Sequence, residues 1–263
     1  MERCAVVATH HKTGTVWMNT TFRAICEALG IPFALIDLNT AVDPESCVAP
    51  MVFADSHSSF RHCRWMLADP RFRIFHLIRD PRDVIISGMH YHRTSKERWL
   101  FVPRAEFGGM DYQTKLNSLA TDSERYLFEM ANCGQKTLRR MLGWNYRRAN
   151  GFECKYEDLV QDVDMSLFTR IATHLGFCED ELEVCRDVFW RNAMFGGKAR
   201  RKGRIHHIRS GEKGQWRTVF DRCLGEEFIN RFGDALVKLG YEEDNSWVGC
   251  LPRNAAALQG VSA

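Results

Sequence analysis

Short apolar runs alternate with stretches of helical periodicity along most of the chain. Five runs rich in β-branched, aromatic and small apolar residues have the length of buried strands, at 4–9, 33–36, 51–54, 72–78 and 152–156. Apolar residues spaced three or four positions apart predict helices at 16–29, 81–93, 113–148, 164–175, 179–193 and 222–239. Strands that alternate with helices are typical of crossover connections, so this pattern predicts an α/β fold with a central parallel sheet flanked by helices.

This arrangement also predicts where a ligand binds, because ligands of open parallel sheets lie beyond the carboxyl ends of the strands. Segments 10–15, 55–57 and 79–87 each follow a strand, and we expect them along one rim of the sheet. The sequence shows no internal repeat and no low-complexity segment. It therefore predicts a single domain over residues 1–263.

Two long segments lack a clean period. Residues 94–112 contain Pro103 and two adjacent glycines, and residues 194–215 are rich in glycine and basic residues. We expect both segments to be mobile lid loops rather than domain boundaries.

Charge changes the picture only locally. The overall charge of +3 is too small to indicate a nucleic-acid partner. Within residues 198–217, however, eight Lys and Arg residues face Glu212 alone, which gives this stretch a charge of +7. An anion-binding segment explains this distribution better than a globally basic surface does.

Composition also bears on the compartment. No apolar run reaches 18 residues, no signal-peptide pattern is visible, and the ten cysteines form no C-x-x-C pair. We expect a cytoplasmic protein with reduced thiols, without a membrane partner. The "HYHR" stretch at 90–93 and the adjacent histidines at 206–207 lack a third ligand at metal-site spacing, so no metal is predicted.

The stretch "HHKTGTVWMNT" at 10–20 lies between the first strand and the first helix. A helix N-terminus favours anions, and Lys12, Thr13 and Thr15 add a charge and two hydroxyls. The spacing is not that of the nucleotide triphosphate loop G-x-x-x-x-G-K-[ST], because the single glycine, Gly14, follows the lysine. On its own, the stretch fits either a phosphate loop or an ordinary strand-to-helix turn.

A second strand–turn–helix, "FHLIRDPRDVIISGMHYH", occupies 75–92. Arg79 stands at the strand end, and Ser87 follows eight residues later, about 12 Å along a helix axis. A guanidinium fork and a hydroxyl suit a phosphate monoester, so both could approach one anion. On its own, the stretch fits equally a surface arginine followed by a serine on a helix.

Four motifs in order resemble those of sulfotransferases that use 3′-phosphoadenosine 5′-phosphosulfate (PAPS). They are "HKTGTVW" at 11–17, "RDPRDVIISG" at 79–88, "YEDL" at 156–159 and "RSGEKGQWRTVF" at 209–220. The resemblance implies a P-loop-like fold, PAPS as co-substrate and 3′,5′-adenosine bisphosphate (PAP) as product. The sequence shows no obvious acidic residue after a second strand to hold magnesium. The resemblance accounts for this, because a lysine near the leaving phosphate oxygen stabilises the developing charge directly.

The resemblance assigns roles residue by residue. The loop would hold the 5′-phosphosulfate, Trp17 would stack on adenine, Tyr156 would touch adenine, and Arg79 with Ser87 would bind the 3′-phosphate. Core packing is the alternative for Trp17 and Tyr156. The full set of implied cofactor contacts is Lys12, Thr13, Gly14, Thr15, Val16, Trp17, Arg79, Ser87, Tyr156, Arg209, Ser210 and Gly211.

Soluble members of the family use a histidine after the third strand as general base, and "VFADSHSSF" supplies His57. His62 and His11 are the competing candidates. The family often has a lysine where this chain has Asp55, two residues earlier. Asp55 could orient His57 or raise its pKa, receive a cationic acceptor, or cap the next turn.

Ser210 is a second departure, because the family usually has lysine there. The family's short C-terminal dimer motif is not recognisable after Phe220, so the oligomeric state stays open.

The predicted function is transfer of the sulfuryl group from PAPS to a hydroxyl or amine of a small molecule, with Lys12 and His57 as catalytic residues. Asp55, Phe60, Tyr91 and Trp99 are candidate contacts for the acceptor. A carbohydrate, lipid or peptide-tyrosine acceptor is the alternative within this chemistry. A P-loop kinase and a catalytically inactive nucleotide-binding protein are the alternatives of other classes.

Overall fold

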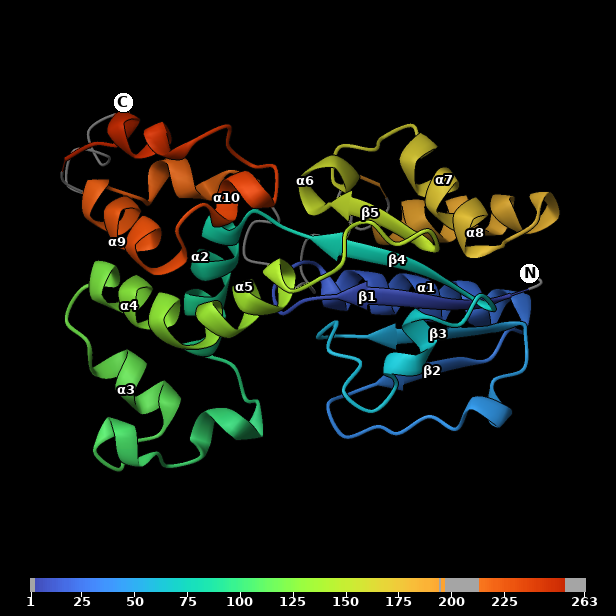
Figure 1. Cartoon of the computed structure of the whole chain (residues 1–263), viewed down its shortest axis with the longest axis horizontal. Coiled ribbons are helices and arrows are strands. Elements are labelled where there is room, and N and C mark those ends of the chain that lie inside the picture. Colours follow the sequence, from blue (N-terminus) through green and yellow to red (C-terminus); the bar gives the residue numbers. More distant parts are fainter. Residues whose placement is uncertain (1–2, 194, 197–212, 254–263) are drawn as a thin grey trace. The chain divides into compact units, whose positions relative to one another are not determined.

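A computed structural model describes residues 3–193, 195–196 and 213–253. They fall into two compact units (Figure 1). Unit 1 comprises Met1–Arg79 and Gly143–Gly211, and unit 2 comprises Asp80–Leu142 and Glu212–Ala263. Each unit has a hydrophobic core of its own. The single domain over 1–263 stays a prediction.

Unit 1 is built on five parallel strands in the order β2-β3-β1-β4-β5. The predicted α/β fold with a central parallel sheet is confirmed, and each strand matches its predicted bounds to within one residue. The strands are β1 Cys4–Thr9, β2 Phe33–Ile36, β3 Met51–Asp55, β4 Phe72–Ile78 and β5 Gly151–Lys155.

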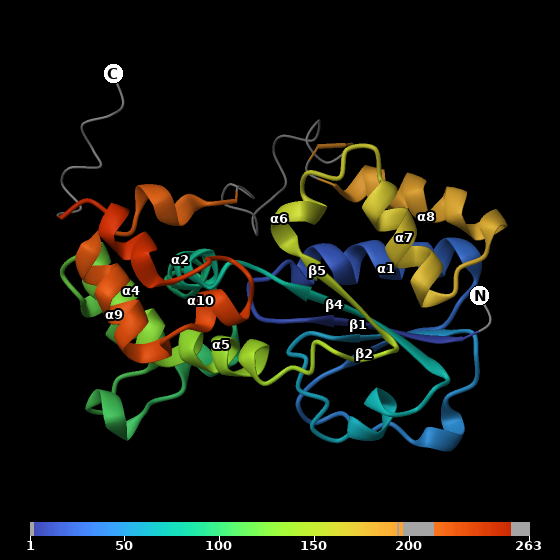
Figure 2. The ribbon, with the colours of Figure 1, turned by 45° about the horizontal axis from the view of Figure 1, so that its top comes forward.

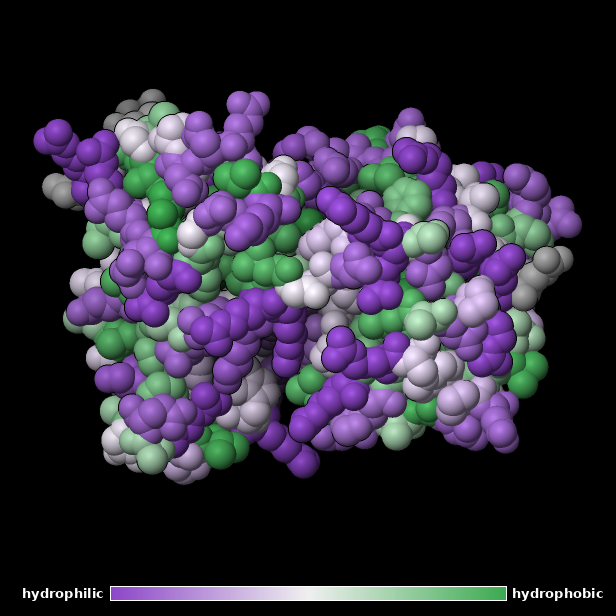
Figure 3. All heavy atoms as spheres, in the orientation of Figure 1, coloured by the Kyte–Doolittle hydropathy of each residue, from purple (hydrophilic) through white to green (hydrophobic). Residues whose placement is uncertain are grey.

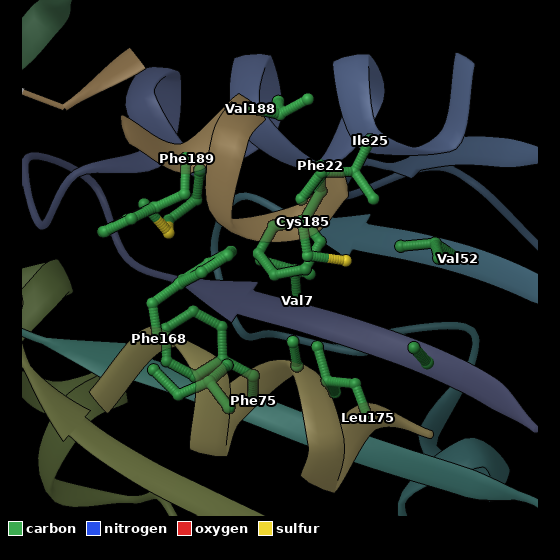
Figure 4. Packing of buried hydrophobic residues seen from close by; sticks show 14 of the residues in the cluster. Val7, Phe22, Ile25, Val52, Phe75, Phe168, Leu175, Cys185, Val188 and Phe189 are labelled. Carbon is green, nitrogen blue, oxygen red and sulfur yellow. The ribbon is translucent and has the colours of Figure 1, made fainter. Parts of the chain in front are cut away.

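Helices of unit 1 cover one face of this sheet, where α1, α7 and α8 pack together (Figure 2). The core there joins alternate strand residues such as Val7 and Phe75 to Phe22, Phe168 and Phe189 from these helices (Figure 4). The helical elements of unit 1 are α1 Thr15–Leu29, η1 Pro44–Ser46, η2 Arg64–Leu67, α6 Tyr156–Leu159, α7 Ser166–Leu175 and α8 Glu179–Asn192.

The opposite face of the sheet buries the other set of alternate strand residues. Val6 on β1 and Ile74 on β4 belong to this second cluster, together with Phe60 and Trp144 from connecting segments. Side chains of a strand alternate between the two faces of the sheet, and both faces are covered here. As a result, β1 is buried along its whole length.

Unit 2 is helical, with its core formed mainly by aromatic and branched side chains. Its elements are α2 Pro81–His92, η3 Arg98–Phe101, η4 Ala105–Phe107, α3 Tyr112–Ser118, α4 Asp122–Glu129, η5 Met130–Gly134, α5 Gln135–Leu142, η6 Gln215–Thr218, α9 Arg222–Phe232, α10 Ala235–Lys238 and η7 Asn245–Cys250.

Two helix predictions in unit 2 were wrong in extent. The predicted helix 113–148 is three helices, because α3 ends before Leu119 and Thr121 starts α4 with a capping box to Glu124. A single π-helical turn, η5, then separates α4 from α5. The predicted helix 222–239 ends at Phe232, because Gly233 takes a positive φ of 55° and α10 follows separately.

The loop predicted at 94–112 contains two short 3₁₀ helices, η3 and η4. Most of the loop predicted at 194–215 lies outside the described residues.

All ten cysteines are described and are free thiols. Hydrophilic side chains predominate on the face that Figure 3 shows. Within the described ranges, no helix combines the length and the apolar character needed to cross a membrane.

Candidate active site

The segment between β1 and α1, residues 10–14, forms a tight loop with two residues in left-handed backbone conformations. Lys12 has φ 66° and Gly14, the N-cap of α1, has φ 107°. A β-carbon at Gly14 would lie 3.2 Å from Cδ2 of Tyr156 and 3.3 Å from Cδ2 of Leu77. Glycine is therefore required here both by the backbone and by the close approach of Tyr156. We call residues 10–15 the phosphate loop.

Threonine hydroxyls close the phosphate loop on itself. The Thr13 hydroxyl accepts from the His10 N–H at 2.9 Å and lies 2.9 Å from the His10 carbonyl oxygen. Thr15 Oγ1 donates to the same carbonyl at 2.8 Å, so the Thr9 hydroxyl, 2.9 Å from Thr15 Oγ1, donates to it. These hydroxyls thus hold the loop in shape. The sequence analysis predicted only that the hydroxyls of Thr13 and Thr15 would face a phosphate, and it did not include this structural role.

Arg79, directly after β4, joins the phosphate loop. Its Nη1 donates to the Lys12 carbonyl oxygen at 3.3 Å, and its guanidinium lies 4.7 Å from the centroid of the Tyr156 ring. Unit 1 therefore brings Lys12, Arg79 and Tyr156 together, and their contacts with a cofactor stay predictions. Ser87 is half-buried on α2, in unit 2, and its meeting with Arg79 at one anion stays a prediction.

Trp17 is packed into the core of unit 1. Its ring stacks on Phe189 with centroids 5.4 Å apart and meets the Tyr156 ring edge-on at 6.1 Å. Only 6% of Trp17 is exposed, whereas 58% of its neighbour Val16 is. The contacts of Trp17 and Tyr156 with adenine stay predictions, and these rings would form a pre-packed wall for it.

The turn after β3 carries His57, and Asp55 organises it. The Asp55 carboxylate accepts from the backbone N–H of His57 at 2.8 Å and from that of Phe60 at 3.0 Å. Ser58, with φ 47°, donates its hydroxyl to the Thr9 carbonyl oxygen at 2.9 Å. These contacts support the role of Asp55 as the cap of the turn. The half-buried His57 thus lies on a turn that is tied to the end of β1.

The other histidines proposed as bases differ in setting. His62 is exposed and His11 is half-buried within the phosphate loop. The assignment of the base to His57 stays a prediction, with both histidines as its alternatives.

The predicted acceptor contacts lie in different surroundings. Phe60 is fully buried and packs against Trp144, with centroids 5.9 Å apart. In unit 2, the Tyr91 hydroxyl donates to Glu97 Oε1 at 2.8 Å and Trp99 Nε1 donates to Glu97 Oε2 at 2.5 Å. Glu97 therefore fixes both aromatic side chains, and their contact with an acceptor stays a prediction.

The C-terminal motif is described only in part. Arg209, Ser210 and Gly211 lie outside the described residues. Further along, the backbone N–H groups of Gly214 and Trp216 donate to the Asp83 carboxylate at 2.7 and 3.0 Å. Within unit 2, Asp83 of the "RDPRDVIISG" motif thus binds the described end of the C-terminal motif.

Sequence reasoning missed a chain of hydrogen-bonded side chains in unit 1, formed by His10, His76 and Glu153. We call these three side chains the relay. His10 Nε2 lies 2.8 Å from His76 Nε2, and His76 Nδ1 lies 2.5 Å from Glu153 Oε2. Trp144 stacks on His76 at 4.0 Å between centroids and donates its Nε1–H to Glu153 Oε1 at 2.8 Å. A histidine inside the apolar run "FRIFHLI" was the available signal.

Comparison with known proteins decides the family. The model of the sulfotransferase domain matches residues 3–240. The chain belongs to the sulfotransferase domain family. The family predicted from four motifs is confirmed, and with it the P-loop-like fold and the expectation of a sulfotransferase enzyme.

One relative and two solved structures are similar to this chain. The amine sulfotransferase of Oryctolagus cuniculus is 26% identical over 258 residues, which cover 84% of this chain and 79% of the relative. A mouse sulfotransferase complexed with PAP has a similar fold, with a TM-score of 0.60, 16% identity and coverage of 92% of this chain and 88% of that one. Retinol dehydratase in complex with androsterone and inactive cofactor PAP gives a TM-score of 0.54 and 19% identity over 89% of this chain and 80% of that one.

Proposed function

We propose that this sulfotransferase moves the sulfuryl group of PAPS to a hydroxyl or amine of a small molecule. The observation that carries the proposal is the junction of Arg79 with the phosphate loop, where Arg79 Nη1 donates to the Lys12 carbonyl oxygen. One cation at the loop and one at the adjoining strand end suit a ligand with two separate anionic groups. PAP bound to two proteins of similar fold supports the same donor.

The residues present fit such a cofactor. Its 5′ end would meet Lys12 and the N-terminus of α1, and its 3′-phosphate would meet Arg79. Gly14 leaves the loop backbone without a β-carbon at its close approach to Tyr156, and Lys12 adopts a left-handed backbone conformation two residues earlier. When bound, PAPS supplies an activated sulfuryl group whose leaving group is a phosphate.

Two residues would then act on the reacting atoms. The Lys12 ammonium would stabilise the charge that develops on the leaving phosphate oxygen. The neutral imidazole of His57 would accept the proton of the acceptor hydroxyl or amine on its unprotonated ring nitrogen, Nδ1 or Nε2. The capped turn at Asp55 would hold His57 in place for this step.

The named activity of the rabbit relative favours an amine among the acceptors. Carbohydrate, lipid and peptide-tyrosine acceptors are alternatives that a screen would separate. We also propose a cytoplasmic location and no nucleic-acid partner, as the composition predicted.

The test is a screen of small amines and alcohols with PAPS labelled in its sulfuryl group. The proposal expects label in at least one acceptor, and a protein that transfers none to any acceptor class contradicts it. Retention on immobilised PAP but not on immobilised ATP would exclude the P-loop kinase. Retention on PAP without turnover would favour the inactive nucleotide-binding protein.

A further inference from the structure

The relay crosses the sheet of unit 1 on one face. His76 pairs in register with Glu153 on β5 and with Ala8 on β1, and His10 follows Ala8 by two residues. Both histidines are fully buried, whereas the Glu153 side chain keeps 26% of its surface exposed. Glu153 can therefore exchange a proton with water, whereas the fully buried His76 ring can exchange protons with its two partners in the relay.

The hydrogen bonds of the relay have two possible directions. When Glu153 is protonated, its O–H donates to His76 Nδ1, His76 Nε2–H donates to His10 Nε2, and the neutral His10 ring carries its proton on Nδ1. When Glu153 is ionised, His76 Nδ1–H donates to the carboxylate, and His10 Nε2–H donates to His76 Nε2. The first state holds three protons and the second holds two, so one proton reverses both bonds.

The surroundings place this change near neutral pH. Burial raises the pKa of Glu153 to about 7, against the hydrogen bond from Trp144 and the charge of Arg148, which lower it. Burial, together with Arg148, lowers the pKa of His76 to about 3, so this ring stays neutral in both states. Tyr146 faces the pair from the same connection, and burial raises the pKa of its phenol, so it stays neutral as well.

The far end of the relay is part of the phosphate loop. His10 is the residue on whose backbone the loop closes, because its carbonyl oxygen accepts from Thr15 and its N–H donates to Thr13. Nδ1, the end of the relay away from Glu153, is the ring nitrogen closer to this backbone. The tautomer of His10 thus decides whether an N–H or a lone pair lies beside the loop.

We propose that His10, His76 and Glu153 are positioning residues for the phosphate loop, with the protonation of Glu153 selecting the His10 tautomer and thereby the strength with which the loop holds an anion. This rests on the proposed function, which makes the loop the site of a phosphate. An anion there favours the state with Nδ1–H and with no charge on Glu153, because N–H attracts the anion and a carboxylate repels it. Binding should therefore take up a proton.

Calorimetry with PAP tests this in buffers of different ionisation heat at pH 6, 7 and 8. The wild-type protein should take up more protons near pH 7 than Glu153→Gln, whose amide cannot titrate. Its affinity should fall about fivefold more between pH 6 and 8 than that of the variant, the low end of coupling between sites. Ionisation of PAP itself is common to both proteins and cancels. Glu27→Gln, an exposed carboxylate on α1, is the matched control and should behave as wild type.

Two further measurements separate this from a structural role. Nitrogen NMR of labelled histidine should show His76 exchanging Nε2–H for Nδ1–H as the pH rises in wild type, but not in Glu153→Gln. Trp144→Phe removes a hydrogen bond that lowers the pKa of Glu153, so the pH at which affinity falls should move upward.

Equal proton uptake and equal pH dependence in wild type and Glu153→Gln would overturn the relay while leaving PAP binding intact. Wild-type protein that binds no PAP would instead overturn the proposed function. If Glu153→Gln does not fold, Trp144→Phe decides, and an unmoved pH dependence in that variant rejects the inference.

Discussion

The left-handed backbone of Lys12 allows its charge and its conformation to be tested separately. Lys12→Ala and Lys12→Gly both remove the ammonium, but only alanine keeps a β-carbon at φ 66°. A β-carbon in this region costs ~1–2 kcal/mol, whereas glycine loses ~0.5–1 kcal/mol more on folding through backbone entropy. We therefore expect Lys12→Gly to be more stable than Lys12→Ala by ~0.5–1 kcal/mol.

Turnover should respond differently from stability. Both variants lack the group that would stabilise the leaving phosphate, so both should lose ~10²–10³ in the rate of sulfuryl transfer. Stability is measured by urea denaturation and by the thermal midpoint, where 1 kcal/mol corresponds to ~2–4 °C in a chain of this size. Lys238→Ala, on the surface of α10, is the control for loss of a lysine.

The two results can refute separate parts of the reasoning. Near wild-type turnover in Lys12→Gly would remove the Lys12 ammonium from the mechanism. An alanine variant as stable as the glycine variant would show that the loop does not hold residue 12 in the left-handed region.

Three further predictions follow from the site. Arg79→Ala should weaken PAP by ~1.5–3 kcal/mol in calorimetry and leave 5′-AMP nearly unchanged, and equal losses would contradict the placement of Arg79 at the 3′-phosphate. His57→Ala should cut turnover by ~10²–10⁴ and remove the rise of rate with pH through the histidine pKa, whereas an unchanged pH profile would bring the alternative histidines forward. The stability contribution of His76 is lost as the pH falls from 6.5 towards 3, and that of Glu153 is lost as the pH rises from 4.5 towards 7. Between pH 4.5 and 6.5 the two contributions oppose each other, so the free energy of unfolding from urea denaturation should depend less on pH in wild type than in Glu153→Gln. The variant should gain stability as the pH rises. Identical slopes in the two proteins would contradict the raised pKa of Glu153.

The strands and the turn between β1 and α1 could be predicted because their signals are local. Each strand is a continuous apolar run, and the residues after β1 and β4 carry the motifs themselves. Helix ends in unit 2 were harder, since the period of apolar residues continues across the breaks. The capping box at Thr121 was visible in the sequence, whereas a positive φ at Gly233 depends on how the chain turns between α9 and α10.

Long-range polar contacts lay beyond sequence reasoning. His10 and Glu153 lie 66 and 77 positions from His76, and no local pattern links them. Asp55 shows the complementary case, because a carboxylate two residues before His57 fits several roles in sequence. Only the backbone hydrogen bonds to His57 and Phe60 distinguish the cap from the others.

The hydroxyls of the phosphate loop have a consequence for how affinity is distributed between folding and binding. Thr13 and Thr15 fix the loop through the His10 carbonyl group before any anion arrives. The entropy of ordering this segment is therefore lost when the chain folds, and an incoming anion meets a preorganised cradle. The threonines that hold the loop in shape then affect how much of the electrostatic attraction is expressed as affinity, because a loosened loop would lose part of it on becoming ordered.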